Sequence, residues 1–88
     1  MLIVKLYSQD GTTTTFNKLK AYDNVDYWDV DTLDGTINIK QQGREVVTIS
    51  PLEYTAIVLT CNLEDQQFEF NDRDWVSKAN YWLIKNWL

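Results

Sequence analysis

The segment Asn71–Leu88, NDRDWVSKANYWLIKNWL, decides the fold because it is the clearest helix in the sequence. It holds three of the four tryptophans, and neither glycine nor proline interrupts it. At the helical period, Trp82 lies at the margin of an apolar face made of Trp75, Val76, Ala79, Leu83 and Trp87. The opposite face carries Asp74, Lys78, Tyr81 and Lys85. We therefore predict an amphipathic helix over 72–87 that packs across a sheet.

Both ends of this helix carry suitable residues. Asn71 is predicted to be the N-cap, since its side chain can accept a hydrogen bond from a free backbone amide. Asp72 and Asp74 place negative charge at the helix start, and Lys85 places positive charge near its end. These charges complement the helix macrodipole.

Length and charge restrict the class of protein. The 88 residues predict one domain over 1–88. Thirteen acidic and eight basic residues give a net charge of −5, which argues against direct binding of nucleic acid or of an anionic membrane. Cys61 is the only cysteine, which fits a reducing compartment, and the apolar start is too short for a signal peptide. We expect a cytoplasmic protein, in the host cytoplasm if a phage encodes it.

The segments before the helix read as strands. Alternating or β-branched residues predict strands over 2–7, 12–16, 25–32, 36–41, 45–50 and 55–61, with a short edge strand over 67–70. The segment 17–24 reads as a connection, and 62–65 as a polar turn. Tight turns at Asp34-Gly35 and Gln42-Gly43 join residues 25–50 into a three-stranded meander. The predicted fold is therefore α+β: a small, mostly antiparallel sheet packed against one C-terminal helix.

The sequence leaves two structural features undecided. A two-residue loop at 42–43 would place Lys40 opposite Glu45, whereas a three-residue loop would place Ile39 opposite Val47. The apolar run 52–61 favours a strand buried on both faces, but a short helix over 52–58 competes with it.

The residue types needed for catalysis are largely missing. Histidine is absent, which removes the usual general base and the commonest metal ligand. Cys61 lies in an apolar run and is expected to be an unreactive core thiol. The acids near Asp29 fail the calcium-loop pattern because Leu33 and Lys40 replace required carboxylates. Asp29 and Asp31 would also be too solvated to act as a catalytic pair. We expect no enzyme, cofactor or metal site.

The acidic stretch 23–34 is the most unusual feature. On an unbroken strand, Asp26, Trp28, Val30 and Thr32 would share one face, and Val25, Tyr27, Asp29 and Asp31 the other. One interpretation is a solvated face whose charges keep the sheet soluble. The other is a docking surface for a basic protein, with an aromatic anchor. Its candidate residues are Asp23, Asp26, Tyr27, Trp28, Asp29, Asp31 and Asp34.

A second candidate surface lies on the helix. Tyr81, Ile84 and Leu88 fall outside the main apolar face, so they are predicted either to cover the sheet edge or to make a homodimer contact.

Together these features favour a non-catalytic module that binds another protein. Its small size, acidity and lack of catalytic motifs suit an accessory protein of a phage or mobile element. A sharper version is an inhibitor that occupies the basic, nucleic-acid-binding surface of its partner. The alternative is a structural subunit of a self-assembling complex such as a phage particle.

Overall fold

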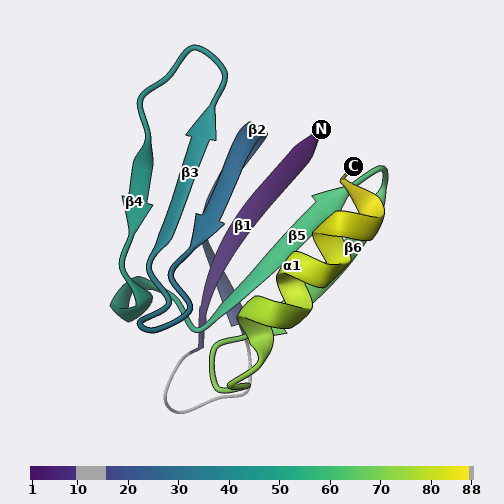
Figure 1. The fold of residues 1–88 in the computed structure, drawn as a ribbon. Coiled ribbons are helices and arrows are strands. Elements are labelled where there is room, and N and C mark those ends of the chain that lie inside the picture. The colour runs from purple at the N-terminus through teal and green to yellow at the C-terminus, as the bar shows by residue number, and fades with distance from the viewer. Residues whose placement is uncertain (10–15, 88) are drawn as a thin grey trace.

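The computed structural model describes residues 1–9 and 16–87, and it shows one antiparallel sheet with one helix against it (Figure 1). The sheet has six strands in the order β4-β3-β2-β1-β5-β6. The helix, α1 (Trp75–Asn86), lies across β5 and β6 on one face (Figure 1). The predicted α+β class is thus confirmed. The strands are β1 (Leu2–Gln9), β2 (Phe16–Val30), β3 (Ile37–Gln41), β4 (Val47–Ile49), β5 (Ala56–Cys61) and β6 (Glu64–Glu69).

The strand β2 is the main departure from the sequence prediction. It runs unbroken for 15 residues, so the predicted connection at 17–24 is wrong. Of the strand predicted over 12–16, residues 12–15 lie outside the described residues. The pairing of β2 shifts register three times, twice against β1 and once against β3. Each shift places an extra residue on β2, and such bulges bend a strand while leaving it continuous.

The meander β2-β3-β4 has the register of the longer loop. Ile39 pairs with Val47 and Ile37 with Ile49, so Lys40 does not face Glu45. The next segment forms a single 3-10 turn, η1 (Pro51–Glu53), which Ser50 and Glu53 close with a capping box. The chain then enters β5, so the competing helix over 52–58 is wrong. The inner face of β5 is buried, whereas Val58 and Thr60 on its other face are half-buried.

The hairpin β5-β6 turns on two residues instead of the predicted four. Asn62 and Leu63 have φ values of 53° and 68°, a left-handed pair that matches the twist of adjoining strands. β6 therefore begins at Glu64, earlier than the predicted edge strand over 67–70. Phe68 is buried, but Phe70 lies beyond the strand and is 40% exposed.

The core lies between α1 and the inner face of the sheet. Leu2, Val4 and Leu6 of the central strand β1 pack there. The helix contributes the predicted apolar face, because Trp75, Val76, Ala79 and Leu83 are buried and Trp82 and Trp87 are half-buried against it. Burial of these large side chains is the main stabilising contribution to a chain of this size.

The start of α1 differs from the prediction. The helix begins at Trp75, and its N-cap is Asp74, which makes no side-chain capping bond. The predicted N-cap, Asn71, lies in the preceding turn. The carboxylate of Asp72 instead accepts the Asp74 amide at 3.0 Å and pairs with the Lys78 ammonium at 2.6 Å. The Asp72 amide donates to the carbonyl of Glu69 at 3.0 Å, so a turn precedes the helix.

Candidate functional site

The structure separates the aromatic residues of the acidic stretch 23–34. Trp28 points toward the helix, where its Nε1 donates to Oδ1 of Asn80 at 3.0 Å. Val25 also faces inward and is only 3% exposed. Tyr27 lies between them in sequence but faces outward and is 49% exposed. The register shift between Val25 and Tyr27 explains this, because the extra residue Asp26 reverses the alternation predicted for an unbroken strand.

The outward residues form a surface that we call the Tyr27 surface, defined as Asp26, Tyr27 and Asp29. All three are exposed and belong to the end of β2 that pairs with β3, beyond Val25, the last residue of β2 that pairs with β1. A basic residue lies beside them, since Lys40 of β3 pairs with Tyr27. The predicted residue Asp23 lies apart from this surface, because Gln41 on the core side donates to its carbonyl at 2.9 Å and to its carboxylate at 3.4 Å. The structure thus brings together three of the seven predicted residues.

Asp31 and Asp34, the last two predicted acids, stabilise the turn between β2 and β3. Asp31 accepts the Leu33 amide at 2.7 Å, and Asp34 accepts the Thr36 amide at 2.8 Å. The backbone amide of Thr36, followed by its side chain, holds the pKa of Asp34 below its ordinary value. Both carboxylates therefore have a local role that aspartate commonly fills in turns.

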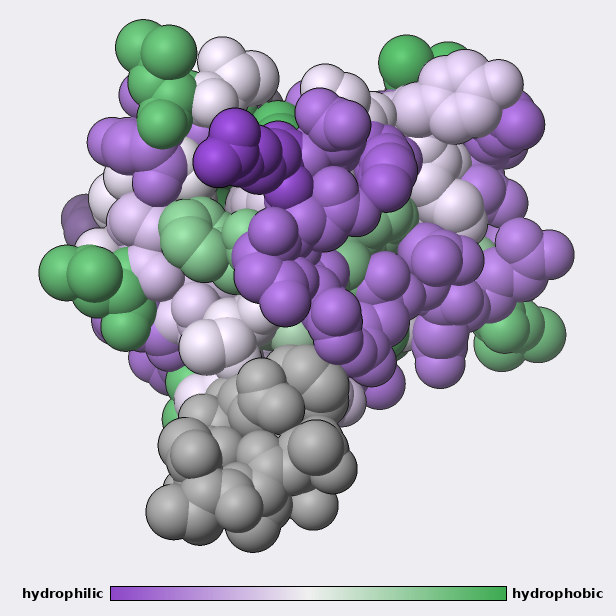
Figure 2. All heavy atoms as spheres, turned by 90° about the horizontal axis from the view of Figure 1, so that it is seen from below, coloured by the Kyte–Doolittle hydropathy of each residue, from purple (hydrophilic) through white to green (hydrophobic). Residues whose placement is uncertain are grey.

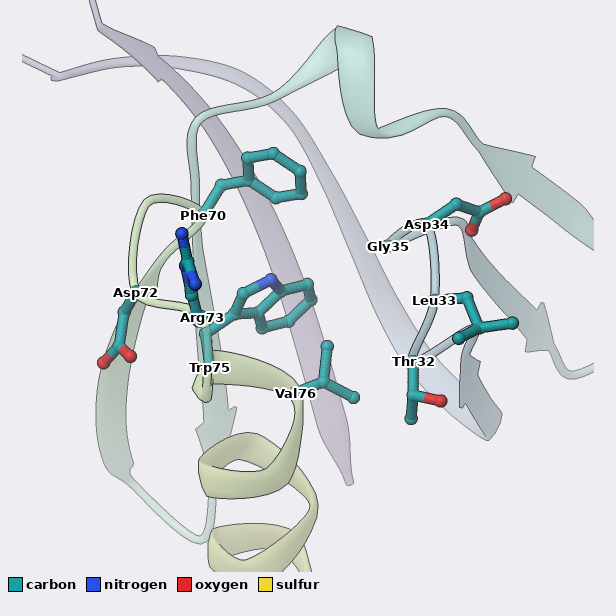
Figure 3. Close-up of a pocket in the computed structure, with 9 residues that line it drawn as sticks. All are labelled: Thr32, Leu33, Asp34, Gly35, Phe70, Asp72, Arg73, Trp75 and Val76. Carbon is teal, nitrogen blue, oxygen red and sulfur yellow. The ribbon is translucent and has the colours of Figure 1, made fainter.

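A cavity of about 180 Å³ lies between this turn and the start of α1 (Figure 3). Phe70, Trp75 and Val76 line it from the helix side, opposite Thr32 and Leu33 (Figure 3). The carboxylates of Asp34 and Asp72 point away from the gap instead of converging on it (Figure 3). A catalytic centre needs titratable groups that converge on one reacting position, and this cavity has no such pair.

Tyr54 supports this cavity and was missed by the sequence analysis. Its hydroxyl donates to the Gly35 carbonyl at 2.6 Å, and its ring makes edge-to-face contacts with Phe70 and Trp75. Burial, followed by the negative charge of Asp34, raises its pKa above the ordinary value. Residues this far apart in sequence give no local signal of their contact, so only the folded structure reveals it.

Among the residues that the structure describes, no three His, Cys, Asp or Glu side chains form a group that could hold a metal ion. The buried thiol of Cys61 lies 3.0 Å from the Asn86 carbonyl at the end of α1. Over the same described residues, no helix is long and apolar enough to cross a membrane.

Exposed apolar residues occur singly at the end of the molecule that holds this cavity. Leu33 and Leu52 are 96% and 95% exposed. Viewed from below, hydrophobic residues at this end project one at a time among hydrophilic ones (Figure 2). Isolated exposed leucines are ordinary on protein surfaces, whereas a large contiguous patch would indicate an interface.

The second predicted surface, on the outer side of α1, is partly described. Tyr81 and Ile84 are 61% and 63% exposed, and Leu88 lies outside the described residues. The Lys85 ammonium lies 4.4 Å from the Tyr81 ring centre, a cation–π contact. Ile84 borders a hollow of about 290 Å³ whose other lining residues are Trp28, Asn80, Leu83 and Trp87.

Comparison with known proteins identifies no relative of this chain. The chain has no significant match among protein-family models, curated proteins or solved structures.

Proposed function

We propose that the protein is a non-catalytic module that binds another protein through the Tyr27 surface. The observation that carries this proposal is a half-exposed aromatic ring beside two acids, on the part of β2 that pairs with β3. The single helix lies on the opposite face, so nothing among the described elements covers Tyr27. Aromatic side chains on rigid supports are the usual anchors of protein interfaces.

The charge of this surface favours a basic partner. Asp26 and Asp29 flank Tyr27, and the whole chain carries a net charge of −5. Carboxylates spaced along a strand resemble a row of phosphates, so a nucleic-acid-binding groove is the best electrostatic match. Occupying that groove would exclude nucleic acid and make the protein an inhibitor. Such an encounter suits the cytoplasm, where a buried free thiol such as Cys61 stays reduced.

Affinity capture with charge-reversed baits tests the proposal. Three baits are compared in nuclease-treated host lysate: the wild type, Asp26→Lys/Asp29→Lys, and Asp65→Lys/Glu69→Lys. Both variants change the net charge equally, but the second pair lies on the edge strand β6, away from the Tyr27 surface. Each bait is first shown to fold by circular dichroism. We expect the wild type and the β6 variant to retain a basic nucleic-acid-binding protein, which an added oligonucleotide displaces.

The Asp26→Lys/Asp29→Lys bait should lose that protein. Equal retention by all three baits would contradict a role for the Tyr27 surface. Equal loss from both charge-reversed baits would contradict a specific role of the Tyr27 surface, because capture would then depend on net charge or also on β6.

A second candidate function, a self-assembling structural subunit, is favoured by the outer side of α1. Ile84 and Tyr81 are largely exposed, and Ile84 borders the apolar hollow at Trp87. If this surface joins two copies, sedimentation should show oligomers that increase with concentration and disappear in Ile84→Glu. Ser77→Glu, on the same helix and also exposed, is the matched control. A strict monomer at high concentration would rule this candidate out.

A further inference from the structure

The outer edge of β6 offers a row of backbone hydrogen-bonding groups. β6 is the last strand of the sheet, and no described strand pairs with its outer edge. Cys61 and Glu64 close a two-residue hairpin, so Glu64, Gln66 and Phe68 direct their backbone groups toward β5. The intervening residues, Asp65 and Gln67, then direct their amides and carbonyls outward. This edge can therefore accept a further strand.

A groove runs along this edge between β6 and α1. Two hollows form it, of about 370 Å³ and about 280 Å³, and both are lined by Gln66, Phe68 and Lys78. The larger hollow reaches round the strand to Gln67 and Glu69. The smaller one is bordered on the helix side by Tyr81, Trp82 and Lys85.

The two sides of the groove differ in chemistry. On the helix side, Tyr81 and Trp82 present aromatic carbon above the buried Phe68, and Lys85 repels a basic side chain, whereas Lys78 is paired with Asp72. On the other side of β6, the exposed residues are Asp65, Gln67 and Glu69. Successive side chains of an extended peptide point to opposite sides. A strand bound here would therefore place every second side chain against aromatic carbon and the others beside carboxylates.

We propose that an extended segment of a partner protein, with alternating hydrophobic and basic residues, binds as a seventh strand on β6. Backbone hydrogen bonds to Asp65 and Gln67 supply affinity, and the two sides of the groove supply specificity. A second copy of this chain fits poorly, because pairing β6 with itself would bring acidic residues opposite one another. This surface is separate from the Tyr27 surface, so the inference goes beyond the proposed function.

A defined peptide tests this inference without the natural partner. The probe is a short peptide, blocked at both ends, in which lysine and valine alternate. A scrambled peptide of the same composition and a glutamate–valine peptide are the controls. We expect only the alternating lysine peptide to slow amide hydrogen exchange at Asp65 and Gln67.

A backbone substitution then separates strand addition from simple charge attraction. Gln67→Pro removes an outward amide but no bond to β5, a position where an edge strand tolerates proline. Loss of this hydrogen bond and its neighbour should weaken peptide binding about tenfold. Gln67→Ala keeps the amide and should bind like the wild type. A probe N-methylated on its bonding edge should also fail, which serves as the test if Gln67→Pro does not fold.

Charge reversal provides the last comparison. Asp65→Lys/Glu69→Lys should abolish binding of the probe, whereas Asp26→Lys/Asp29→Lys should leave it unchanged. Equal binding of the scrambled peptide, or full binding of the N-methylated probe, would overturn the proposal. Dimers that form through β6 in place of peptide binding would also overturn it.

Discussion

At the scale of single residues, Gly35 is placed where a side chain would be strained and crowded. Its φ is +83°, and an added Cβ would lie 2.8 Å from Cε2 of Phe70. We predict that Gly35→Ala lowers the free energy of unfolding by about 2–4 kcal/mol, the sum of backbone strain and overpacking. Chemical denaturation measures this change.

Gly43 supplies the matched control for that substitution. It has a similar φ of +75°, but an added Cβ would meet nothing within 4 Å. Gly43→Ala should therefore lower the free energy of unfolding only through backbone strain, by about 1–2 kcal/mol. Equal losses in the two variants would mean that the contact with Phe70 is easily relieved.

The buried hydroxyl of Tyr54 predicts a loss of stability at high pH. Its pKa is raised in the folded protein, so the folded state holds this proton more tightly than the unfolded chain does. Its contribution is complete below the ordinary tyrosine pKa of about 10 and is lost as the pH rises beyond that value. Denaturation measured at increasing alkaline pH should show unfolding becoming easier.

Two variants check that Tyr54 is responsible. Tyr54→Phe removes the titrating group along with the bond to the Gly35 carbonyl, so this variant should be less stable near neutral pH but less sensitive to alkali. Tyr81→Phe, at an exposed position, should follow the wild type. The same alkaline decline in Tyr54→Phe would contradict the assignment.

At the scale of elements, the sequence predicts the helix better than the strands. The face containing Trp75 and Leu83 follows from the helical period alone, because a regular helix keeps that period from end to end. The strand β2 departs from the corresponding rule for strands, in which successive side chains alternate between the two faces. Bulges place Val25 and Trp28 on the same face, three residues apart, and nothing local in the sequence marks an extra residue. For this reason the sequence predicts Val25 and Tyr27 on one face, whereas the fold turns Val25 inward and Tyr27 outward.

The helix itself provides a comparison of two aromatic residues on opposite faces. Trp75 is 4% exposed and Tyr81 is 61% exposed. We predict that Trp75→Ala costs about 3–5 kcal/mol, because it leaves a cavity in the core and removes the contact with Tyr54. Tyr81→Ala should cost less than about 1 kcal/mol.

Thermal unfolding of both variants against the wild type measures these costs. A similar loss from the two would show that α1 does not bury the face assigned to it. A loss at Trp75 alone would support the packing described for the helix and sheet.

At the scale of the whole molecule, one helix of about 18 Å covers part of one face of a six-stranded sheet. The sequence predicts this class, since it contains a single amphipathic helix among several strands. It does not predict the strand order, because the position of β1 between β2 and β5 depends on long-range pairing. The surfaces left uncovered, around Tyr27 and along β6, follow from that order.

The sequence likewise predicts only part of the candidate site. The acids at Asp26 and Asp29 are conspicuous in composition and stay outward in the fold. Asp31 and Asp34 look identical to them in sequence, yet the structure commits both to backbone hydrogen bonds in a turn. The fold determines which acids lie together on the surface and remain available to a partner, and the sequence alone does not give this arrangement.

The proposed binding role of the Tyr27 surface is tested most directly by NMR, which compares the protein's amide signals with and without the basic protein that it captures. We expect the largest changes at Asp26–Asp29 of β2 and at its neighbour Lys40 of β3, and we expect these changes to vanish in Asp26→Lys/Asp29→Lys. Changes confined to the outer side of α1, with the signals around Tyr27 unmoved, would contradict it.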